Sequence, residues 1–399
     1  MVPDVSFGNL LVVAAVAVCA PLFVRLVPGI RMPAVVLEIV AGIVLGPSVL
    51  GWVEVDLPVQ ILALVGLAFL LFLAGLEIDI VGLRGRVLRK AGLGFAATVA
   101  LGIVVGLAFA AVGYVRSPLL IAVALSATSL GLVVPVLKDA HQVDQPVGQL
   151  TIAGASVADF GAIVLLSLLF SEMAASVGST IFLLVMFAAL VVVGALVLAR
   201  LMRSVRLDAL LVSLQDTTAE IRVRFAVVLL VGFVALAERL GLETILGAFV
   251  AGAILNMVDR DSMSHPNFRL KLEAIGYGFV VPVFFISSGI RFDLQALFDS
   301  PSAALKVPLF LLALLAVRGV PAALYAKEIG RRRAVSAGLL QATSLPFLVT
   351  ATQIGLDLGE IRPDTAAALV SAGLLSVVIF PLAALSLLRG RSREPERVG

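Results

Sequence analysis

The sequence predicts an all-α integral membrane protein with about 13 transmembrane helices, assembled from two inverted repeats. Of its 399 residues, 61% are hydrophobic and 14% are charged, and the mean hydropathy is +1.15. Ordinary soluble domains do not have this composition. The apolar runs are also long enough to cross a bilayer core of ~30 Å, which takes ~20 helical residues.

The predicted spans follow one another along the whole chain, and no polar stretch is long enough for a separate soluble domain. The first apolar run lacks the basic start and small-residue exit of a cleaved signal, so we interpret it as a helix. We place the spans at approximately 9–28, 32–52, 58–77, 91–113, 118–137, 148–170, 177–199, 223–240, 243–257, 273–290, 304–325, 333–355 and 364–388.

The basic residues predict the orientation of these spans in the cell membrane. With the N-terminus outside, roughly 23 of the 29 Lys and Arg residues fall on cytoplasmic segments, as the positive-inside rule requires. We therefore predict an extracellular N-terminus and a cytoplasmic C-terminus, with a short cytoplasmic tail at 391–399. The basic clusters either set this orientation alone or also bind lipid or a partner.

Cysteine and histidine are too sparse for a metal cluster. Cys19 stands alone, which excludes an internal disulfide and a cysteine-based metal site. Neither His141 nor His265 has a second ligand at a spacing useful for zinc. We expect no cofactor and no nucleic-acid partner.

Three short phrases occur twice, in the same order and about 210 to 215 residues apart, which indicates a duplicated half-protein. Roughly seven predicted crossings separate each phrase from its copy, and an odd number inverts the second copy in the membrane. Inverted repeats are typical of secondary transporters. The pairs are Ala127-Thr128-Ser129-Leu130 with Ala342-Thr343-Ser344-Leu345, Val40-Ala41-Gly42 with Val250-Ala251-Gly252, and Phe72-Leu73-Ala74-Gly75 before Asp79 with Ile286-Ser287-Ser288-Gly289 before Asp293.

Two charged residues lie deep within predicted spans, where ionisable side chains are costly and mark functional sites. Asp159 lies mid-span with no basic residue in its own helix. A structural aspartate bonded to the backbone is the alternative interpretation. Arg318 stays protonated, so it needs a counter-charge or exposed carbonyl groups. It either clamps broken helix ends or takes part in the site directly.

The two Ala-Thr-Ser-Leu phrases are also mid-span, beside glycine and proline residues that free backbone groups for Thr and Ser hydroxyls. We predict broken helices at Thr128 and Thr343, whose half-helix ends meet near the membrane midplane. Ordinary kinked helices are the alternative. Glu38 and Glu77 lie near cytoplasmic span ends, where they are either solvated or line a funnel toward the site.

Taken together, these residues resemble the cation:proton antiporter superfamily over nearly the whole chain. The closer likeness is to its bacterial Na⁺(K⁺)/H⁺ antiporters and to the membrane domain of glutathione-gated potassium efflux systems. The motifs are Pro33-Ala34-Val35-Val36-Leu37-Glu38 with Ala41-Gly42 and Gly46-Pro47-Ser48, Phe72-Leu73-Ala74-Gly75-Leu76-Glu77, Ser126-Ala127-Thr128-Ser129, Leu246-Gly247-Ala248-Phe249 with Ala251-Gly252, and Pro282-Val283-Phe284-Phe285 with Gly289.

The resemblance implies two six-helix inverted repeats with crossed, discontinuous helices. It implies a scaffold domain for homodimerisation at 1–90 and 223–299. A core ion-transport domain at 91–170 and 300–390 would move against this scaffold. A linker helix and a cytoplasmic loop would occupy 171–222.

The family's ion-binding aspartate and unwound threonine match Asp159 and Thr128, and we add Ser129 as a further ligand for Na⁺ or K⁺. Two positions depart from the electrogenic members. Ala158 stands where many of them carry a second acidic residue, and Arg318 stands where they carry lysine. The supporting residues that we predict are Arg318, Ala158, Ser126, Ser156, Thr343, Ser344, Glu38 and Glu77.

The sequence therefore predicts a homodimeric antiporter in the lipid bilayer that exchanges Na⁺ or K⁺ for H⁺ and is not an enzyme. A single carboxylate in the core predicts electroneutral exchange, with H⁺ and the cation competing at Asp159. The alternative is a potassium efflux channel or transporter of the same fold, gated by a separate regulatory subunit. A membrane hydrolase lacks support, because Gly154-Ala155-Ser156 does not continue as a nucleophile motif.

Overall fold

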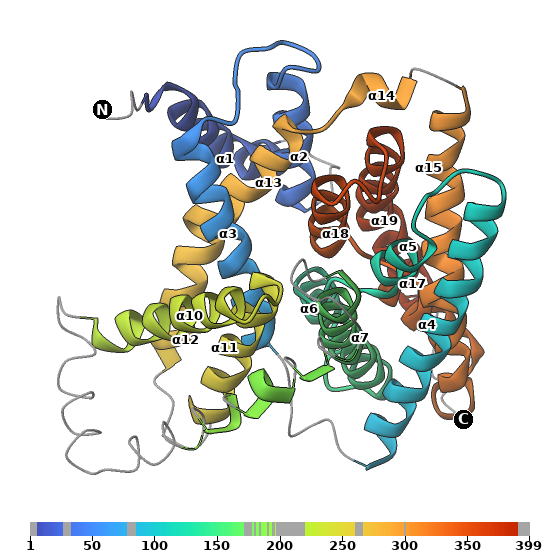
Figure 1. Cartoon of the computed structure of the whole chain (residues 1–399). Coiled ribbons are helices and arrows are strands. Elements are labelled where there is room, and N and C mark those ends of the chain that lie inside the picture. Colours follow the sequence, from blue (N-terminus) through green and yellow to red (C-terminus); the bar gives the residue numbers. More distant parts are fainter. Residues whose placement is uncertain are drawn as a thin grey trace, which may run out of the picture. The chain divides into compact units, whose positions relative to one another are not determined.

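The fold is described by a computed structural model of the chain (Figure 1). Its described residues are 6–26, 33–77, 85–170, 220–259, 266–298 and 301–389, with short stretches between 178 and 196. Every regular element within these residues is helical, which confirms the predicted all-α class. Four predicted features lie outside them: most of the linker segment 171–222, the tail 391–399, Asp79 and His265.

The described residues contain six helices long and apolar enough to cross a membrane, and a bent pair makes a seventh. Four shorter apolar helices accompany them. The predicted count of 13 spans is therefore not confirmed. One predicted span, 32–52, is too long, because the helix α2 (Ala34–Leu45) ends before Gly46 and Pro47. Proline has no N–H and disfavours helical backbone at the preceding residue, which explains this end.

The chain divides into two compact units, and each joins segments from both halves of the sequence. Unit 1 comprises Met1–Gly29, Leu37–Ile78 and Ile163–Phe292. Unit 2 comprises Ile30–Val36, Asp79–Ala162 and Asp293–Gly399.

Unit 1 is built from helices that cross at glycines of the repeated phrases (Figure 1). Its described helices are α1 (Gly8–Leu26), most of α2, α3 (Leu57–Leu76), α10 (Ile221–Arg239), α11 (Thr244–Asp259), α12 (Pro266–Ile275), the π-helical turn η1 (Gly276–Val280) and α13 (Val281–Ile290). A Cβ on Gly42 of α2 would lie 2.2 Å from the carbonyl oxygen of Ile286 in α13. A Cβ on Gly252 of α11 would lie 2.0 Å from that of Phe72 in α3. Each Val-Ala-Gly phrase thus packs, backbone to backbone, on a repeated phrase of the opposite half.

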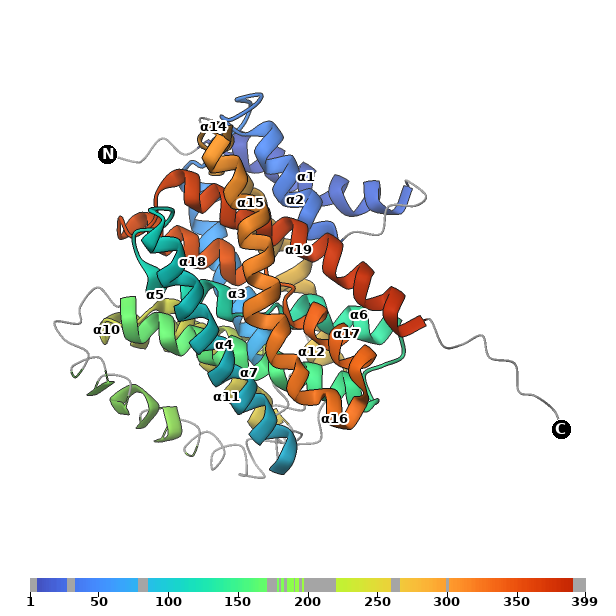
Figure 2. The ribbon, with the colours of Figure 1, turned by 90° about the vertical axis from the view of Figure 1, so that its right-hand side faces the viewer.

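Unit 2 holds two interrupted helices among longer ones (Figure 2). Its helices are α4 (Gly85–Ala111), α5 (Pro118–Ser126), α6 (Leu130–Asp139), the first part of α7 (Pro146–Phe170), α14 (Leu294–Phe298), α15 (Pro301–Leu314), the π-helical turn η2 (Leu315–Gly319), the 3₁₀ segment η3 (Val320–Tyr325), α16 (Ala326–Ile329), α17 (Arg331–Gln341), α18 (Pro346–Asp357) and α19 (Pro363–Arg389). The predicted span at 304–325 is thus one path made of α15, η2 and η3 rather than one regular helix.

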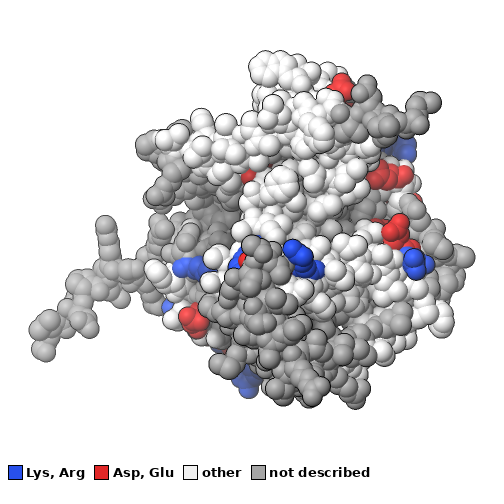
Figure 3. Space-filling model, turned by 90° about the vertical axis from the view of Figure 1, so that its left-hand side faces the viewer, with Lys and Arg blue, Asp and Glu red and all other residues white. Residues whose placement is uncertain are grey.

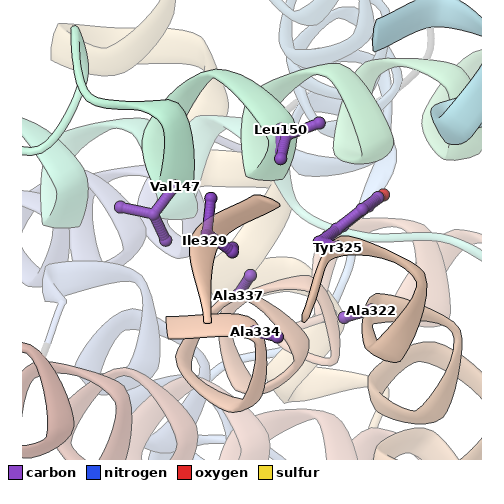
Figure 4. Packing of buried hydrophobic residues seen from close by; sticks show 7 residues of the cluster. All are labelled: Val147, Leu150, Ala322, Tyr325, Ile329, Ala334 and Ala337. Carbon is purple, nitrogen blue, oxygen red and sulfur yellow. The ribbon is translucent and has the colours of Figure 1, made fainter. Parts of the chain in front are cut away.

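A compact apolar cluster fixes α7 against the second half of unit 2 (Figure 4). Val147 and Leu150 of α7 meet Tyr325 at the end of η3, whose ring is 1% exposed. The remaining members are Ala322, Ile329, Ala334 and Ala337. Because alanine predominates on the η3 and α17 side, these helices approach closely and hold the start of α7 in place.

The surface of the described residues is largely apolar. On the face shown in Figure 3, uncharged atoms make up most of the described surface, and charged atoms form a few separate groups. Large apolar side chains such as Trp52, Val104 and Leu312 are 62% to 69% exposed. Such exposure agrees with helices that face lipid rather than water.

Candidate functional site

The first broken helix has a short extended segment at its centre. α5 ends at Ser126 and α6 begins at Leu130. Between them, Ala127 has φ −78° and ψ 157°, and Ser129 has φ −105° and ψ 92°. The helix ends on either side leave backbone N–H and C=O groups without partners inside the helix. The predicted break at Thr128 is confirmed.

The second broken helix repeats this design. α17 ends at Gln341 and α18 begins at Pro346, and the two helix axes differ by 42°. Pro346 cannot donate a backbone hydrogen bond and disfavours helical geometry at the residue before it. The two breaks touch, because the Ser129 N–H donates to the Thr343 carbonyl at 2.9 Å.

Asp159 of α7 caps the second half of the first broken helix. Its Oδ1 accepts the N–H of Thr128 at 3.0 Å, and its Oδ2 accepts the N–H of Leu130 at 3.2 Å. Amide groups at a helix N-terminus carry partial positive charge, so a carboxylate there is stabilised. The alternative interpretation of Asp159, a backbone-bonded aspartate, therefore describes its contacts, but those contacts lie on the unwound segment itself.

Arg318 contacts the side chain of the first break, whereas Asp159 contacts its backbone, and Arg318 is 2% exposed. Its Nε donates to the Thr128 hydroxyl at 2.8 Å, and its Nη2 also bonds that hydroxyl. Its Nη1 donates to the Thr98 hydroxyl at 3.2 Å, and Nη2 approaches the Gly154 carbonyl at 3.4 Å. Arg318 thus binds the oxygens around the end of α5, where the helix dipole favours a cation.

The position of Arg318 depends on an irregular backbone. It lies in the π-helical turn η2, and the 3₁₀ segment η3 follows it directly. Pro321 has no N–H to donate within this path, so the regular hydrogen-bond ladder cannot continue there. π-Helical turns frequently occur at functional sites, where they redirect a side chain.

The Thr128 hydroxyl joins the two broken helices and is fully used in this structure. It donates to the Gln341 carbonyl at 2.7 Å while accepting from Arg318. A hydroxyl has one hydrogen and two lone pairs, and these contacts use them all. A cation can therefore reach this oxygen only by exchanging with Arg318.

Gln341 connects the break to α7. Its Nε2 donates to the Tyr325 hydroxyl at 3.3 Å and to the Thr151 carbonyl at 3.4 Å. A Cβ on Gly154 would lie 2.2 Å from this Nε2. A side chain at position 154 would therefore have to displace this amide and the Tyr325 hydroxyl, which would lie 2.6 Å from the Cβ. Glycine lets both groups lie against α7 next to Thr128.

The remaining predicted residues of unit 2 fall into two groups. The Ser126 hydroxyl donates to the Val123 carbonyl of its own helix at 2.8 Å, and the Thr343 hydroxyl donates to the Leu339 carbonyl of the preceding helix α17 at 3.3 Å. The Ser156 and Ser344 hydroxyls are buried and have no hydrogen-bond partner among the described residues. Ala158 is fully buried beside Asp159.

Two predicted residues lie outside unit 2, and two residues that contact the site were not predicted. Glu38 and Glu77 belong to unit 1, and their relation to the site stays a prediction. Thr98 and Gln341 contact the site but were not predicted. A polar side chain within an apolar span was the available signal for Thr98, and position 341 directly precedes the second repeated phrase.

Comparison with known proteins shows the family to which the chain belongs. The family model described as "Sodium/hydrogen exchanger, transmembrane" matches residues 13–389. The chain belongs to this family. The family is one of transporters, and the predicted superfamily is confirmed.

Individual relatives cover most of the chain. A Bacillus subtilis protein, YjbQ, is 30% identical over 98% of this chain, which spans 64% of the length of that relative. The Na⁺/H⁺-K⁺ antiporter GerN of Bacillus cereus is 28% identical, with 88% of each chain covered. The solved structure of the sodium proton antiporter MjNhaP1 from Methanocaldococcus jannaschii has a TM-score of 0.66 and 17% identity. The match covers 95% of this chain and 97% of the MjNhaP1 chain, so the two proteins have the same fold.

Proposed function

We propose that this protein is an antiporter that exchanges Na⁺ or K⁺ for H⁺ across the membrane, with both ions competing for the Asp159 carboxylate. The observation that carries the proposal is the bond from each Asp159 oxygen to an amide of the unwound first break. The names of relatives support the ions, since GerN is a Na⁺/H⁺-K⁺ antiporter.

The chemistry near Asp159 suits a monovalent cation. Hard cations prefer oxygen ligands, and the two breaks offer hydroxyls and unwound carbonyls beside the carboxylate. Ser156, one helical turn before Asp159 on α7, has a buried hydroxyl without a partner in the described residues. We assign Ser156 and Ser129 as ligands that complete the shell around Asp159. Thr128 joins them when Arg318 withdraws.

Arg318 stabilises the ion-free site. It supplies fixed positive charge beside the break, and it cannot release a proton at physiological pH. Ala158 adds no second carboxylate next to Asp159. Exchange of one H⁺ for one cation then leaves the charge of the site equal in both directions, so the exchange is electroneutral.

The two units suit an alternating-access cycle in which unit 2 carries the ion. Unit 2 contains both broken helices, Asp159 and Arg318. We assign unit 1 as the fixed scaffold and the homodimer contact. We also assign an extracellular N-terminus and a cytoplasmic C-terminus from the distribution of basic residues.

Proteoliposome flux tests this proposal. Outward Na⁺, K⁺, Li⁺ and Rb⁺ gradients are applied in turn, and internal pH is recorded for the wild type and Asp159→Asn. The wild type should move protons against Na⁺ or K⁺ with saturation, and Asp159→Asn should not. Asp357→Asn is the matched control, because Asp357 is an exposed carboxylate of unit 2. Robust exchange by folded Asp159→Asn would reject Asp159 as the carrier.

The same vesicles separate the antiporter from a gated potassium channel and test electroneutrality. An imposed voltage should leave the exchange equilibrium unchanged, whereas each net charge moved would couple at about 2.3 kcal/mol per 100 mV. Flux that follows voltage without saturation would support the channel. Saturable exchange whose equilibrium shifts with voltage would reject the single-carboxylate cycle.

A further inference from the structure

Ser376 of α19 lies against the second break and is 0% exposed. Its hydroxyl accepts the N–H of Ser344 at 3.2 Å. The same hydroxyl lies 3.2 Å from the Ser344 carbonyl and 2.7 Å from the Gly373 carbonyl, and donates its one hydrogen between them. One side chain thus holds both backbone groups of a residue within the unwound segment.

Ser376 contacts the second break in a way similar to that in which Asp159 contacts the first, by accepting a backbone N–H of the Ala-Thr-Ser-Leu phrase. Asp159 lies 31 residues after Thr128, whose N–H it accepts, and Ser376 lies 32 residues after Ser344, whose N–H it accepts. Both are on the long helix that follows the broken one, α7 in the first case and α19 in the second. The two residues are not at equivalent positions of the repeat, because Thr128 and Thr343 are 215 residues apart and this offset aligns Asp159 with Leu374. The likeness lies in the type of contact, a side-chain oxygen that accepts a backbone N–H of the Ala-Thr-Ser-Leu phrase.

The close approach of α19 to this break is built into the sequence. A Cβ on Gly373, one turn before Ser376, would lie 3.0 Å from the Ser344 carbonyl oxygen. A larger side chain there would push α19 away from the break and stretch the Ser376 contacts. Gly373 therefore allows the contacts between the Ser376 hydroxyl and the Ser344 backbone.

A short chain of contacts connects Ser376 to the proposed ion site. Ser376 fixes Ser344, whose neighbour Thr343 presents the carbonyl that accepts the Ser129 N–H at 2.9 Å. Ser129 lies directly between Thr128 and Leu130, the two residues whose amides hold Asp159. A shift of the second break therefore moves Ser129 and the amides on either side of it.

We propose that Ser376 is a positioning residue that sets cation affinity by holding the second break against Ser129. This inference rests on the proposed function, because it assumes that Ser129 and Asp159 bind the transported cation. A hydroxyl performs this task without adding a second titratable group, so the core keeps one proton site.

The test compares exchange kinetics in proteoliposomes for the wild type, Ser376→Ala, Ser376→Thr and Ser386→Ala. Ser386 is a matched control on the same helix, because it is exposed and its hydroxyl donates only to the Ala383 carbonyl three residues earlier. Na⁺ and K⁺ are the probes. Thermal unfolding of each variant in detergent reports the fraction folded.

Ser376→Ala should raise the apparent KM for the cation about threefold to tenfold, with a smaller change in maximal rate, because one buried hydrogen bond is lost. Ser376→Thr keeps the hydroxyl and should return the KM toward the wild-type value, and Ser386→Ala should match the wild type. An unchanged KM in Ser376→Ala with a lower unfolding temperature would overturn the inference, since it would show a structural role alone.

Two further arms keep the test decisive. If Ser376→Thr does not fold because its methyl group overfills the site, Ser376→Ala against Ser386→Ala still decides through the KM. Asp159→Asn is measured in parallel. Its continued exchange would defeat the proposed function, whereas its inactivity combined with a wild-type KM in Ser376→Ala would defeat the Ser376 inference alone.

Discussion

The two breaks of unit 2 share the phrase Ala-Thr-Ser-Leu, yet their surroundings differ in charge. The first break lies between the Asp159 carboxylate and the Arg318 guanidinium. The second is held by the neutral hydroxyl of Ser376 and by backbone contacts. The same local sequence therefore gives the same interrupted helix, while the neighbouring helices decide whether charged or neutral side chains contact the break.

Because their surroundings differ, the two breaks can have different roles. We propose that the charged break changes partners as ions arrive and leave. The neutral break supplies the Thr343 carbonyl that accepts the Ser129 N–H. In the proposed cycle, the single carboxylate at the first break suffices for the exchange.

The largest effect should come from removing the charge beside the first break. Arg318→Met leaves the Thr98 and Thr128 hydroxyls and the Gly154 carbonyl without their donor, and should lower the free energy of unfolding by about 4 kcal/mol. Exchange should fall more than about tenfold, since the end of α5 loses its cation. Thermal unfolding and proteoliposome flux measure both.

The exposed Arg332 on α17 provides the control, and Arg332→Met should behave as the wild type. A stable, fully active Arg318→Met would contradict the assignment of Arg318 to the site.

The two repeated threonines give the direct comparison between the breaks. Thr128→Val removes a hydroxyl bonded to Arg318 and to the Gln341 carbonyl, and should cost about 2 kcal/mol of stability with weaker cation affinity. Thr343→Val removes a hydroxyl bonded to the Leu339 carbonyl of the preceding helix α17 and should cost about 0.5 kcal/mol. Equal losses in the two variants would show that the breaks are energetically alike.

A charge pair elsewhere in unit 2 tests whether any buried charge behaves like those at the break. Lys306 is 4% exposed and its Nζ lies 2.5 Å from Asp364 Oδ2, whose side chain is 28% exposed. Asp364→Asn leaves a buried ammonium without its charge partner and should cost about 2 kcal/mol of stability. Lys306→Met should cost less, because water reaches Asp364.

Neither variant should change the ratio of protons to cations exchanged, because the hydrogen bonds of Lys306 and Asp364 among the described residues join them to each other and to Thr365. A changed ratio in Asp364→Asn, measured as protons per cation in the same vesicles, would place a second carrier there.

The smallest effect is expected at glycines. Gly92 of α4 has open space where a Cβ would lie, so Gly92→Ala should stabilise the helix by about 0.5 kcal/mol. Gly154→Ala should instead destabilise and lower cation affinity, because its methyl group displaces the Gln341 amide. Opposite signs in thermal unfolding are the expected result, and matching signs would contradict the fitted contact at Gly154.

The charged residues of the site could be predicted from the sequence, whereas most of its neutral residues could not. Asp159 and Arg318 were predictable because a charge within an apolar span is costly and therefore conspicuous. Ser376 carries no charge, and its polar side chain in an apolar helix is a weaker signal, like that of Thr98, which does not say what the hydroxyl contacts. The contact of Gln341 with Thr128 uses a backbone carbonyl, which every residue has.

Only part of the irregular backbone could be predicted from the sequence. The repeated phrases and Pro346 predicted the two breaks, whereas the π-helical turn at Arg318 and the early end of α2 depend on how proline redirects the chain within its surroundings. The packing of Gly42 and Gly252 on opposite halves explains why those phrases recur, although the repeat alone did not say what they contact.

Proton release on cation binding tests the central claim most directly. Purified protein in weakly buffered detergent solution is titrated with Na⁺ and then K⁺, and released protons are counted against bound cation. Competition at one carboxylate predicts about one proton per cation at low pH, where Asp159 carries its proton before the cation binds, and an apparent affinity that weakens as pH falls. Asp159→Asn should release none. Cation binding without proton release, or unchanged release by Asp159→Asn, would contradict exchange at Asp159.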